Sequence, residues 1–313
     1  MAMAGDPLSP RLRTTLLGME FANPVIAASG TFGYGVELAP VLPLHQLGGF
    51  VVKGLSREPI RGNPPPRLWE THGGMMNSVG LQNVGVRAFV RDKLPALRGC
   101  GTRVIANVFG YQVDDYVEVI RVLEDAEGLD AYELNVSCPN TKHGGMFFSS
   151  DPRLLAEVVS AAVRAARRPV IVKLSPNVAS IGEPARAAEA SGAAAVSLVN
   201  TFLGLAVDAR TRRTRLGAGY GGVSGPAIKP LALRLVREAA QAVRIPVVGM
   251  GGILTGEDAA EFLIAGASAV EVGTAAMADP CAPIRIAAEL DAFLLETGAP
   301  SAASLVGTLQ WPE

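Results

Sequence analysis

Residues able to carry out chemistry recur in this sequence directly after short apolar runs. Amides, hydroxyls, ammonium groups, a thiol and bare glycine backbone all occur there. The positions are Ser29-Gly30-Thr31, Lys53-Gly54, Asn107, Asn135 with Ser137-Cys138, Lys173, Asn200-Thr201, Gly251-Gly252 and Gly273-Thr274. The carboxyl ends of parallel strands meet at one face of a barrel, so these residues would gather in a single site. A lone buried asparagine or lysine could be a structural anchor, but the repetition after every run predicts a site.

Cys138 differs from Cys100 and Cys281. It lies in Asn135-Val136-Ser137-Cys138-Pro139-Asn140, just past an apolar run, with amide side chains on both sides that could hold a planar polar substrate. A thiol there could act as a nucleophile or, through its thiolate, as a general base. None of the three histidines has a context that would activate a nucleophile, which favours the base. A plain core cysteine is the alternative interpretation.

Two further features suit a phosphorylated heterocycle. Gly251-Gly252 and Gly273-Thr274 offer backbone N–H groups after the last two apolar runs, where barrels commonly bind phosphate, and the glycine-rich stretch 221–225 adds a third loop. Lys53 and Lys173 could stabilise the negative charge of a reduced flavin, the alternative being a salt bridge with a carboxylate of the barrel. No strand is followed by G-x-G-x-x-G and a helix, which excludes a Rossmann dinucleotide-binding unit.

The elements that position these residues alternate between apolar runs and amphipathic stretches of helical length. This pattern is typical of an α/β fold, a (β/α)8 (TIM) barrel, which we expect residues 1–313 to form as one domain, with a doubly wound sheet as the alternative. A β-hairpin is predicted over Leu12–Phe21. The predicted strands are Val25–Ala28, Gly49–Val52, Arg103–Val108, Ala131–Leu134, Pro169–Leu174, Ala194–Val199, Ile245–Val248 and Ala269–Val272. The predicted helices are Asp114–Glu127, Asp151–Arg167, Ile181–Ser191, Ala227–Val243, Thr255–Ala265 and Ile284–Glu296.

Two segments, Ser56–Val84 and Phe202–Gly225, are too long to be simple connections. Long irregular loops in compact domains usually act as lids or binding loops, so we expect both to be inserted active-site loops. A disordered excursion is the alternative for each. The basic stretch Arg210–Arg215 is interpreted as a loop over the cofactor, with a solvated surface as the alternative.

Composition excludes several classes of protein. The chain has 28 Lys and Arg against 29 Asp and Glu, for a net charge of −1, and no long basic run, which argues against a nucleic-acid surface. Three cysteines without a CxxC pair exclude a disulfide scaffold and an all-cysteine zinc or iron–sulfur site within this chain. The first residues lack an apolar signal core, and no apolar run approaches ~18 residues, so we expect a cytoplasmic enzyme that does not contact membranes.

Several motifs in combination resemble the class 1 dihydroorotate dehydrogenases. They are Asn77–Asn83, Asn135–Asn140, Val172–Pro176, Gly222–Pro230 and Gly249–Ile253, and the resemblance extends from about Leu12 to the last helix. It implies an FMN-containing barrel that oxidises dihydroorotate to orotate in pyrimidine biosynthesis. Cys138 matches the catalytic base, which would remove a proton from C5 of the substrate while C6 passes a hydride to the flavin.

The resemblance also implies the ligand contacts, and no metal is among them. The implied FMN contacts are Ser29, Lys53, Gly54, Asn107, Asn135, Lys173, Val199, Gly225, Gly251, Gly252, Gly273 and Thr274. The implied substrate contacts are Lys53, Asn77, Ser78, Val79, Gly80, Leu81, Asn135, Asn200 and Thr201.

Within this family, Asn107–Gly110, Gly222–Pro230 and Gly249–Ile253 look closest to class 1B. That likeness implies a partner subunit carrying FAD and a [2Fe–2S] cluster, electron transfer to NAD, and a heterotetramer built on a homodimer of this chain. A class 1A homodimer that reduces fumarate fits the cysteine-poor composition equally well.

Three other functions compete with this interpretation. A flavin barrel acting on RNA, like the dihydrouridine synthases, would need a basic tract. An α-hydroxy-acid oxidase would need a histidine at a strand end, and none of the three is so placed. A non-catalytic barrel acting as a binding module would be colourless when purified.

Overall fold

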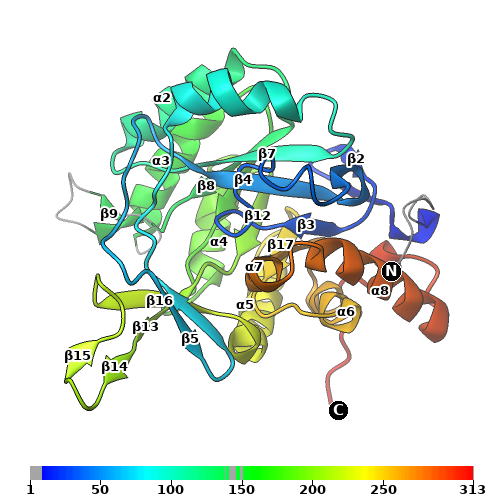
Figure 1. Cartoon of the computed structure of the whole chain (residues 1–313). Helices are drawn as coiled ribbons and strands as arrows, with labels where there is room; N and C mark the ends of the chain where they lie inside the picture. The colour runs from blue at the N-terminus through cyan, green and yellow to red at the C-terminus, as the bar shows by residue number, and fades with distance from the viewer. Residues whose placement is uncertain (1–8, 138, 141–145, 149–150, 313) are drawn as a thin grey trace.

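Eight parallel strands close into a barrel at the centre of the molecule (Figure 1). The computed structural model describes residues 9–137, 139–140, 146–148 and 151–312. The strands follow one another around the ring in chain order, and the last pairs with the first. They are β3 (Val25–Ala27), β4 (Gly49–Leu55), β7 (Arg103–Val108), β8 (Ala131–Asn135), β11 (Val170–Lys173), β12 (Ala195–Leu198), β17 (Val247–Met250) and β18 (Ala269–Val272). The predicted (β/α)8 barrel is confirmed.

Helices cover the outside of the barrel, and all six predicted helices are present with shifted ends. Local sequence sets several of these ends. Thr255 and Asp258 form a capping box at the start of α6, and Asp151 caps α3 in front of Pro152. The α-helices are α1 (Val86–Ala88), α2 (Val113–Glu124), α3 (Pro152–Ala165), α4 (Gly182–Ala190), α5 (Lys229–Ala242), α6 (Gly256–Ala265), α7 (Thr274–Ala278) and α8 (Ala282–Thr297). Shorter helical segments are Pro10–Leu12, Leu44–Gln46, Phe89–Lys93, Leu94–Leu97, Pro226–Ile228 and Ala302–Leu305.

An antiparallel hairpin of β1 (Thr14–Leu16) and β2 (Met19–Phe21) precedes the barrel, as predicted. Leu17 and Gly18 form its turn, both with positive φ (57° and 73°), which is the backbone that a two-residue hairpin turn requires. Leu16 and Phe21 are buried against the apolar residues of the barrel interior. The hairpin therefore closes the end of the barrel where the strands begin.

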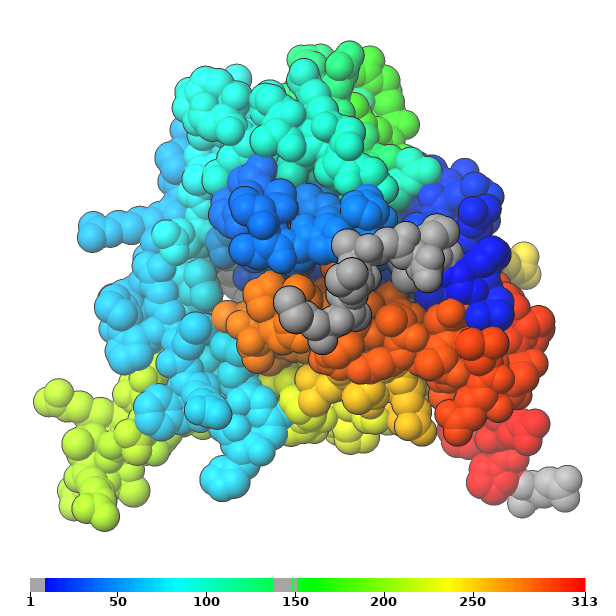
Figure 2. All heavy atoms as spheres, turned by 45° about the vertical axis from the view of Figure 1, so that its right-hand side comes forward, coloured from blue at the N-terminus to red at the C-terminus, as the bar shows by residue number. Residues whose placement is uncertain are grey.

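The two long insertions line the cavity at the carboxyl ends of the strands, as predicted, but they are not the irregular loops that were expected. Together they build a four-stranded antiparallel sheet of β5 (Leu68–Thr71), β6 (Gly74–Asn77), β13 (Phe202–Leu205) and β16 (Tyr220–Ser224). A short hairpin of β14 (Val207–Asp208) and β15 (Arg213–Thr214) projects from it (Figures 1 and 2). The central pairing joins Gly222 to Asn77 across 145 residues of sequence. Such pairing leaves little local signal, and the many glycines of these segments weaken the strand pattern.

The barrel interior is built in two layers because alternate strand residues point inward. The first layer is apolar and takes one residue from each strand: Ile26, Val51, Ile105, Ala131, Ile171, Ala195, Val248 and Ala269. Two positions further along the same strands lie Ala28, Lys53, Asn107, Glu133, Lys173, Ser197, Met250 and Glu271. This second layer is polar apart from the alanine and the methionine, and it lies toward the carboxyl ends of the strands.

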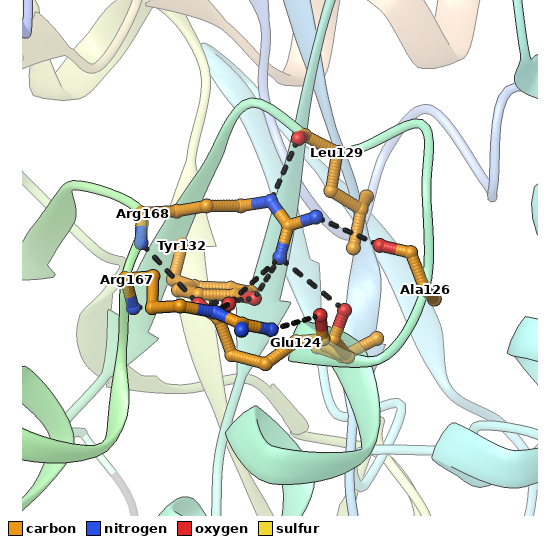
Figure 3. A network of polar contacts seen from close by, with 7 residues as sticks. Glu124, Ala126, Leu129, Tyr132, Arg167 and Arg168 are labelled. Carbon is orange, nitrogen blue, oxygen red and sulfur yellow. Dashed lines mark hydrogen bonds and ion pairs between the residues drawn. The ribbon is translucent and has the colours of Figure 1, made fainter.

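A clamp around Glu124 ties α2 to the start of β8 and β11 at the opposite end of the barrel (Figure 3). The Glu124 carboxylate accepts hydrogen bonds from Arg167 Nε at 2.8 Å, Arg168 Nη1 at 3.1 Å and the Tyr132 hydroxyl at 3.1 Å. Arg168 also donates to the carbonyls of Leu129 and Ala126. The clamp satisfies backbone groups that the end of α2 and the following turn would otherwise leave unpaired.

In the described ranges of the chain, none of the helices combines the length and the apolar character that a membrane span requires.

Candidate active site

A cavity of about 680 Å³ opens at the carboxyl ends of the barrel strands. Strand-end residues of the barrel and residues of β6, β13 and β16 line it, so the small sheet forms one wall. The volume falls within the ~300–1,000 Å³ typical of small-molecule and cofactor sites.

The structure brings every predicted site residue that it describes into this one cavity. Which ligand atoms they contact stays a prediction. The predicted residues that line it are Ser29, Lys53, Gly54, Asn77, Ser78, Val79, Gly80, Leu81, Asn107, Asn135, Lys173, Val199, Asn200, Thr201, Gly225, Gly251, Gly252, Gly273 and Thr274.

Cys138, the predicted base, lies outside the described residues. Two neighbours on its amino side, Asn135 and Ser137, do line the cavity. The role of Cys138 therefore stays a prediction.

Glycine backbone forms one edge of the cavity. Gly225, Gly251 and Gly252 all have positive φ (102°, 128° and 80°) and are packed tightly. A Cβ on Gly252 would lie 2.9 Å from the Gly225 carbonyl oxygen, so any side chain here would displace the neighbouring loop. Beside them the Thr274 hydroxyl donates to Ser224 Oγ at 2.8 Å. The edge thus presents hydroxyls and bare backbone, the groups that hold a phosphate.

Amide side chains form an ordered group on another side of the cavity. Asn200 Nδ2 donates to Ser137 Oγ at 3.0 Å and lies 3.3 Å from Asn135 Oδ1, while Asn200 Oδ1 accepts from the Thr201 N–H at 2.9 Å. Asn135 Oδ1 also accepts from the Ser137 N–H at 3.1 Å. These bonds fix the amide planes, so the remaining donors and acceptors can recognise a planar heterocycle.

Lys53 and Lys173 are the only charged side chains among the described residues that line the cavity. Burial, together with the positive charge of Arg67, lowers the pKa of Lys53. Lys173 is deeply buried, and burial alone would lower its pKa, but the carboxylates beside it raise the pKa instead. Two cationic side chains without a lining carboxylate favour an anionic ligand.

Two functional candidates escaped the sequence prediction, Glu133 and Glu271. Lys173 Nζ lies 3.4 Å from Glu133 Oε1 and 3.3 Å from Glu271 Oε2, so the alternative of a salt bridge with barrel carboxylates is confirmed for this lysine. Both glutamates stand inside runs that the sequence prediction treated only as apolar strands. A charged residue within such a run, at an inward position of the two-residue period, was the signal that could have revealed them.

The interpretation of Arg210–Arg215 as a loop over the cofactor was wrong. The stretch lies in the β14–β15 hairpin, where residues 210–214 are exposed, and none of it lines the cavity. Arg215 stacks 4.5 Å from the ring centre of Trp69 and pairs with Asp208 at 2.7 Å. The alternative, a solvated surface, is confirmed.

Comparison with known proteins identifies the family. A family model described as dihydroorotate dehydrogenase matches residues 11–294. The chain belongs to the dihydroorotate dehydrogenase family.

Similar dihydroorotate dehydrogenases carry two different names. A protein of Solibacter usitatus (strain Ellin6076), "Putative dihydroorotate dehydrogenase A (fumarate)", is 68% identical over 97% of this chain and 100% of its own length. "Dihydroorotate dehydrogenase B (NAD(+)), catalytic subunit" of Geobacter metallireducens (strain ATCC 53774 / DSM 7210 / GS-15) is 49% identical over 96% and 99%. The protein of that name from Trichlorobacter lovleyi (strain ATCC BAA-1151 / DSM 17278 / SZ) is 48% identical over 97% and 100%. The electron acceptor named for these relatives therefore differs.

The cavity fits the FMN that dihydroorotate dehydrogenases use. The side-chain-free edge around Gly251 and Gly252 suits a phosphate, and Lys173 and Asn107 offer donors at the floor, where an anionic flavin edge would be stabilised. The amide group of Asn135 and Asn200 lines the same cavity.

Proposed function

We propose that this protein is a class 1 dihydroorotate dehydrogenase that oxidises (S)-dihydroorotate to orotate in the de novo synthesis of UMP. The observation that carries the proposal is the convergence of two lysines, an ordered amide group and a glycine edge on one cavity. FMN, when bound there, supplies the acceptor for the hydride from C6 of the substrate.

The chain's own residues supply binding and proton transfer. The Cys138 thiolate takes the proton from C5. Asn77, Asn135 and Asn200 hold the ring carbonyls and N–H groups of the substrate, and Lys53 attracts its carboxylate. Asn77 is itself oriented, since its Nδ2 donates to the Gly222 carbonyl of β16 at 3.4 Å. This support of Asn77 at the cavity wall by the small sheet is consistent with the proposed substrate contact.

Substitution of Cys138 tests the base. In Cys138→Ala, we expect anaerobic flavin reduction by dihydroorotate to slow by about 10²–10⁴-fold, the usual contribution of a general base, and the rise of the wild-type rate with pH to disappear. Stopped-flow bleaching of the flavin measures both. Cys281→Ala is the matched control because Cys281 is exposed and does not line the cavity. Fast reduction in Cys138→Ala would overturn the assignment.

For the electron acceptor, we propose NAD⁺, reached through a partner subunit that carries FAD and a [2Fe–2S] cluster, in a heterotetramer built on a homodimer of this chain. The similarity to relatives named as NAD⁺-type catalytic subunits, over nearly their full length, supports this assignment.

Fumarate is the second candidate acceptor, and the 68% identical relative named for fumarate favours it. The test is to reduce the purified chain with dihydroorotate and then add fumarate without any partner. Reoxidation at the rate of turnover supports the fumarate type. Slow reoxidation by fumarate, with NAD⁺ reduction restored by a co-purified flavin and iron–sulfur subunit, supports the NAD⁺ type.

A further inference from the structure

Three ionisable side chains are enclosed together in the second layer of the barrel. Lys173, Glu133 and Glu271 are 5%, 0% and 1% exposed, and Lys173 Nζ lies between the two carboxyls, at 3.4 and 3.3 Å. Lys173 lines the cavity, whereas neither glutamate does. The lysine therefore faces the site with two carboxyls behind it.

The two carboxyls differ in their hydrogen-bond partners. Glu133 accepts hydrogen bonds from Asn107 Nδ2 at 2.6 Å and from Ser197 Oγ at 2.8 Å, which satisfy a carboxylate. Among the described residues, Glu271 accepts only from Lys173, and none of them donates to its buried Oε1. Lys173 Nζ lies within 3.4 Å of an oxygen of each carboxyl, so two negative charges would share one cation. Like charges this close in a buried site favour retention of a proton on the carboxyl with fewer donors.

The net charge of the three side chains also indicates that one carboxyl is protonated. With both glutamates ionised, the enclosed group would have a net charge of −1, and burial of such uncompensated charge is costly. The strands on either side of Glu271 contribute no ionisable residue to the second layer. The residue at this level is Ala28 directly after β3 and Met250 in β17. Across the described interior, Lys53 is the remaining charged side chain, and it lines the cavity. One retained proton makes the group neutral.

The pKa values of the two carboxyls are shifted in opposite directions. Burial and the nearby negative charge of Glu133 raise the pKa of Glu271 well above its ordinary value. Burial also acts on Glu133, but the charge of Lys173 and the hydrogen bonds from its neighbours outweigh it and lower the pKa of Glu133. Paired carboxyls in a dry site behave in this way when only one of them can ionise.

We propose that Glu271 is a positioning residue for Lys173: it retains its proton while Glu133 is ionised, and so leaves the lysine a single counter-ion and a positive charge directed at the cavity. The consequence for the flavin rests on the proposed function. While Glu271 is neutral, Lys173 favours the reduced, anionic flavin. When Glu271 ionises, the added negative charge makes flavin reduction less favourable.

The first test detects the proton directly and requires neither substrate nor an electron acceptor. Infrared spectra of the purified chain should show the carbonyl stretch of a buried, protonated carboxylic acid near neutral pH. The band should be absent from Glu271→Gln and retained in Glu124→Gln, which removes the buried carboxylate of the clamp instead. Absence of the band from the wild type, or its survival in Glu271→Gln, would overturn the proposal and leave the proposed function intact.

The second test asks which carboxyl holds the proton. Glutamine resembles a protonated carboxyl, so Glu271→Gln should unfold at the same temperature as the wild type near neutral pH. Glu133→Gln should unfold at a clearly lower temperature, because one amide cannot accept from Asn107, Ser197 and Lys173 as a carboxylate does. The opposite order would place the proton on Glu133 and overturn the assignment to Glu271.

The third test measures the effect on bound flavin by spectroelectrochemistry. Wild type and Glu271→Gln should have the same midpoint potential near neutral pH. At alkaline pH the midpoint potential of the wild type should be lower than that of the variant. The expected difference is at least tenfold in the equilibrium constant for reduction, which is about 30 mV for a two-electron couple. Identical pH profiles would show that Glu271 does not act on the flavin, even if dihydroorotate oxidation is fully confirmed.

Discussion

Glu124 and the pair Glu133 and Glu271 are buried carboxyls at different levels of the same barrel, and positive charge balances them differently. At the amino end, Glu124 has two arginines and the Tyr132 hydroxyl as partners (Figure 3). Toward the carboxyl end, Glu133 and Glu271 have one lysine between them. Tyr132 and Glu133 are consecutive in β8, so their side chains point to opposite faces of the strand. Tyr132 belongs to the clamp and Glu133 to the interior group.

Glu124 has more cationic partners than it needs, whereas Glu133 and Glu271 have fewer. This difference distinguishes a carboxylate that stabilises the fold from carboxyls that act on the site. The clamp provides its carboxylate with several donors and joins helix, turn and strands, and none of its residues lines the cavity. The interior group leaves one carboxyl oxygen without a donor next to the cavity. Barrel enzymes place catalysis at the carboxyl ends of strands and stability at the amino ends, and this asymmetry follows that division.

Removal of the cation that lies between the two interior carboxyls should have the largest effect. Lys173→Met leaves Glu133 without its charged partner, and we expect a loss of about 3–5 kcal/mol in the free energy of unfolding, as for other broken buried ion pairs. We also expect loss of bound FMN. Urea unfolding and flavin absorbance measure the two effects. In the control Lys93→Met, which removes a half-exposed surface pair with Glu37, the change should stay below about 1 kcal/mol.

Removal of the clamp carboxylate should cost stability without affecting the reaction. Glu124→Gln is expected to lower the free energy of unfolding by about 1–3 kcal/mol, because buried donors of Arg168 and Tyr132 lose part of their acceptor. The rate of flavin reduction per bound FMN should not change. Glu238→Gln, in an exposed pair with Arg234, is the matched control. A slower reaction at unchanged stability would remove the distinction between the two groups.

The smallest predicted effect is a difference in how stability depends on pH. Hydrogen bonds from Arg167 and Arg168 outweigh burial and lower the pKa of Glu124, so its contribution is present above the ordinary carboxyl pKa and is lost as pH falls through the folded value. The pKa of Glu271 is raised, so folding takes up a proton there. Its contribution is present at low pH and is lost as pH rises from the ordinary value through the folded one.

Urea midpoints measured over a pH series check this difference. Glu124→Gln should flatten the acidic limb of the stability profile, and Glu271→Gln the limb toward higher pH. If both variants alter the same limb, the two groups are not balanced in the way the structure indicates.

Much of the barrel was predictable because its signals are local. Short apolar runs bounded by turn residues marked all eight strands, and caps such as Thr255 marked helix starts. The small sheet was not predictable in this way, since β6 and β16 acquire their partners from distant parts of the chain. The prediction for Arg210–Arg215 was wrong for the same reason, because a basic stretch does not indicate which distant segment of the chain it will lie against.

The sequence by itself determined which chemical groups end each strand, and with them the cavity and the family, because parallel strands in a barrel must deliver their ends to one face. Only the tertiary structure decided how the charges among those groups are balanced. Glu133, Lys173 and Glu271 come from three strands, with Glu133 and Glu271 138 residues apart in the sequence, and their ionisation depends on distances and burial that no local pattern encodes.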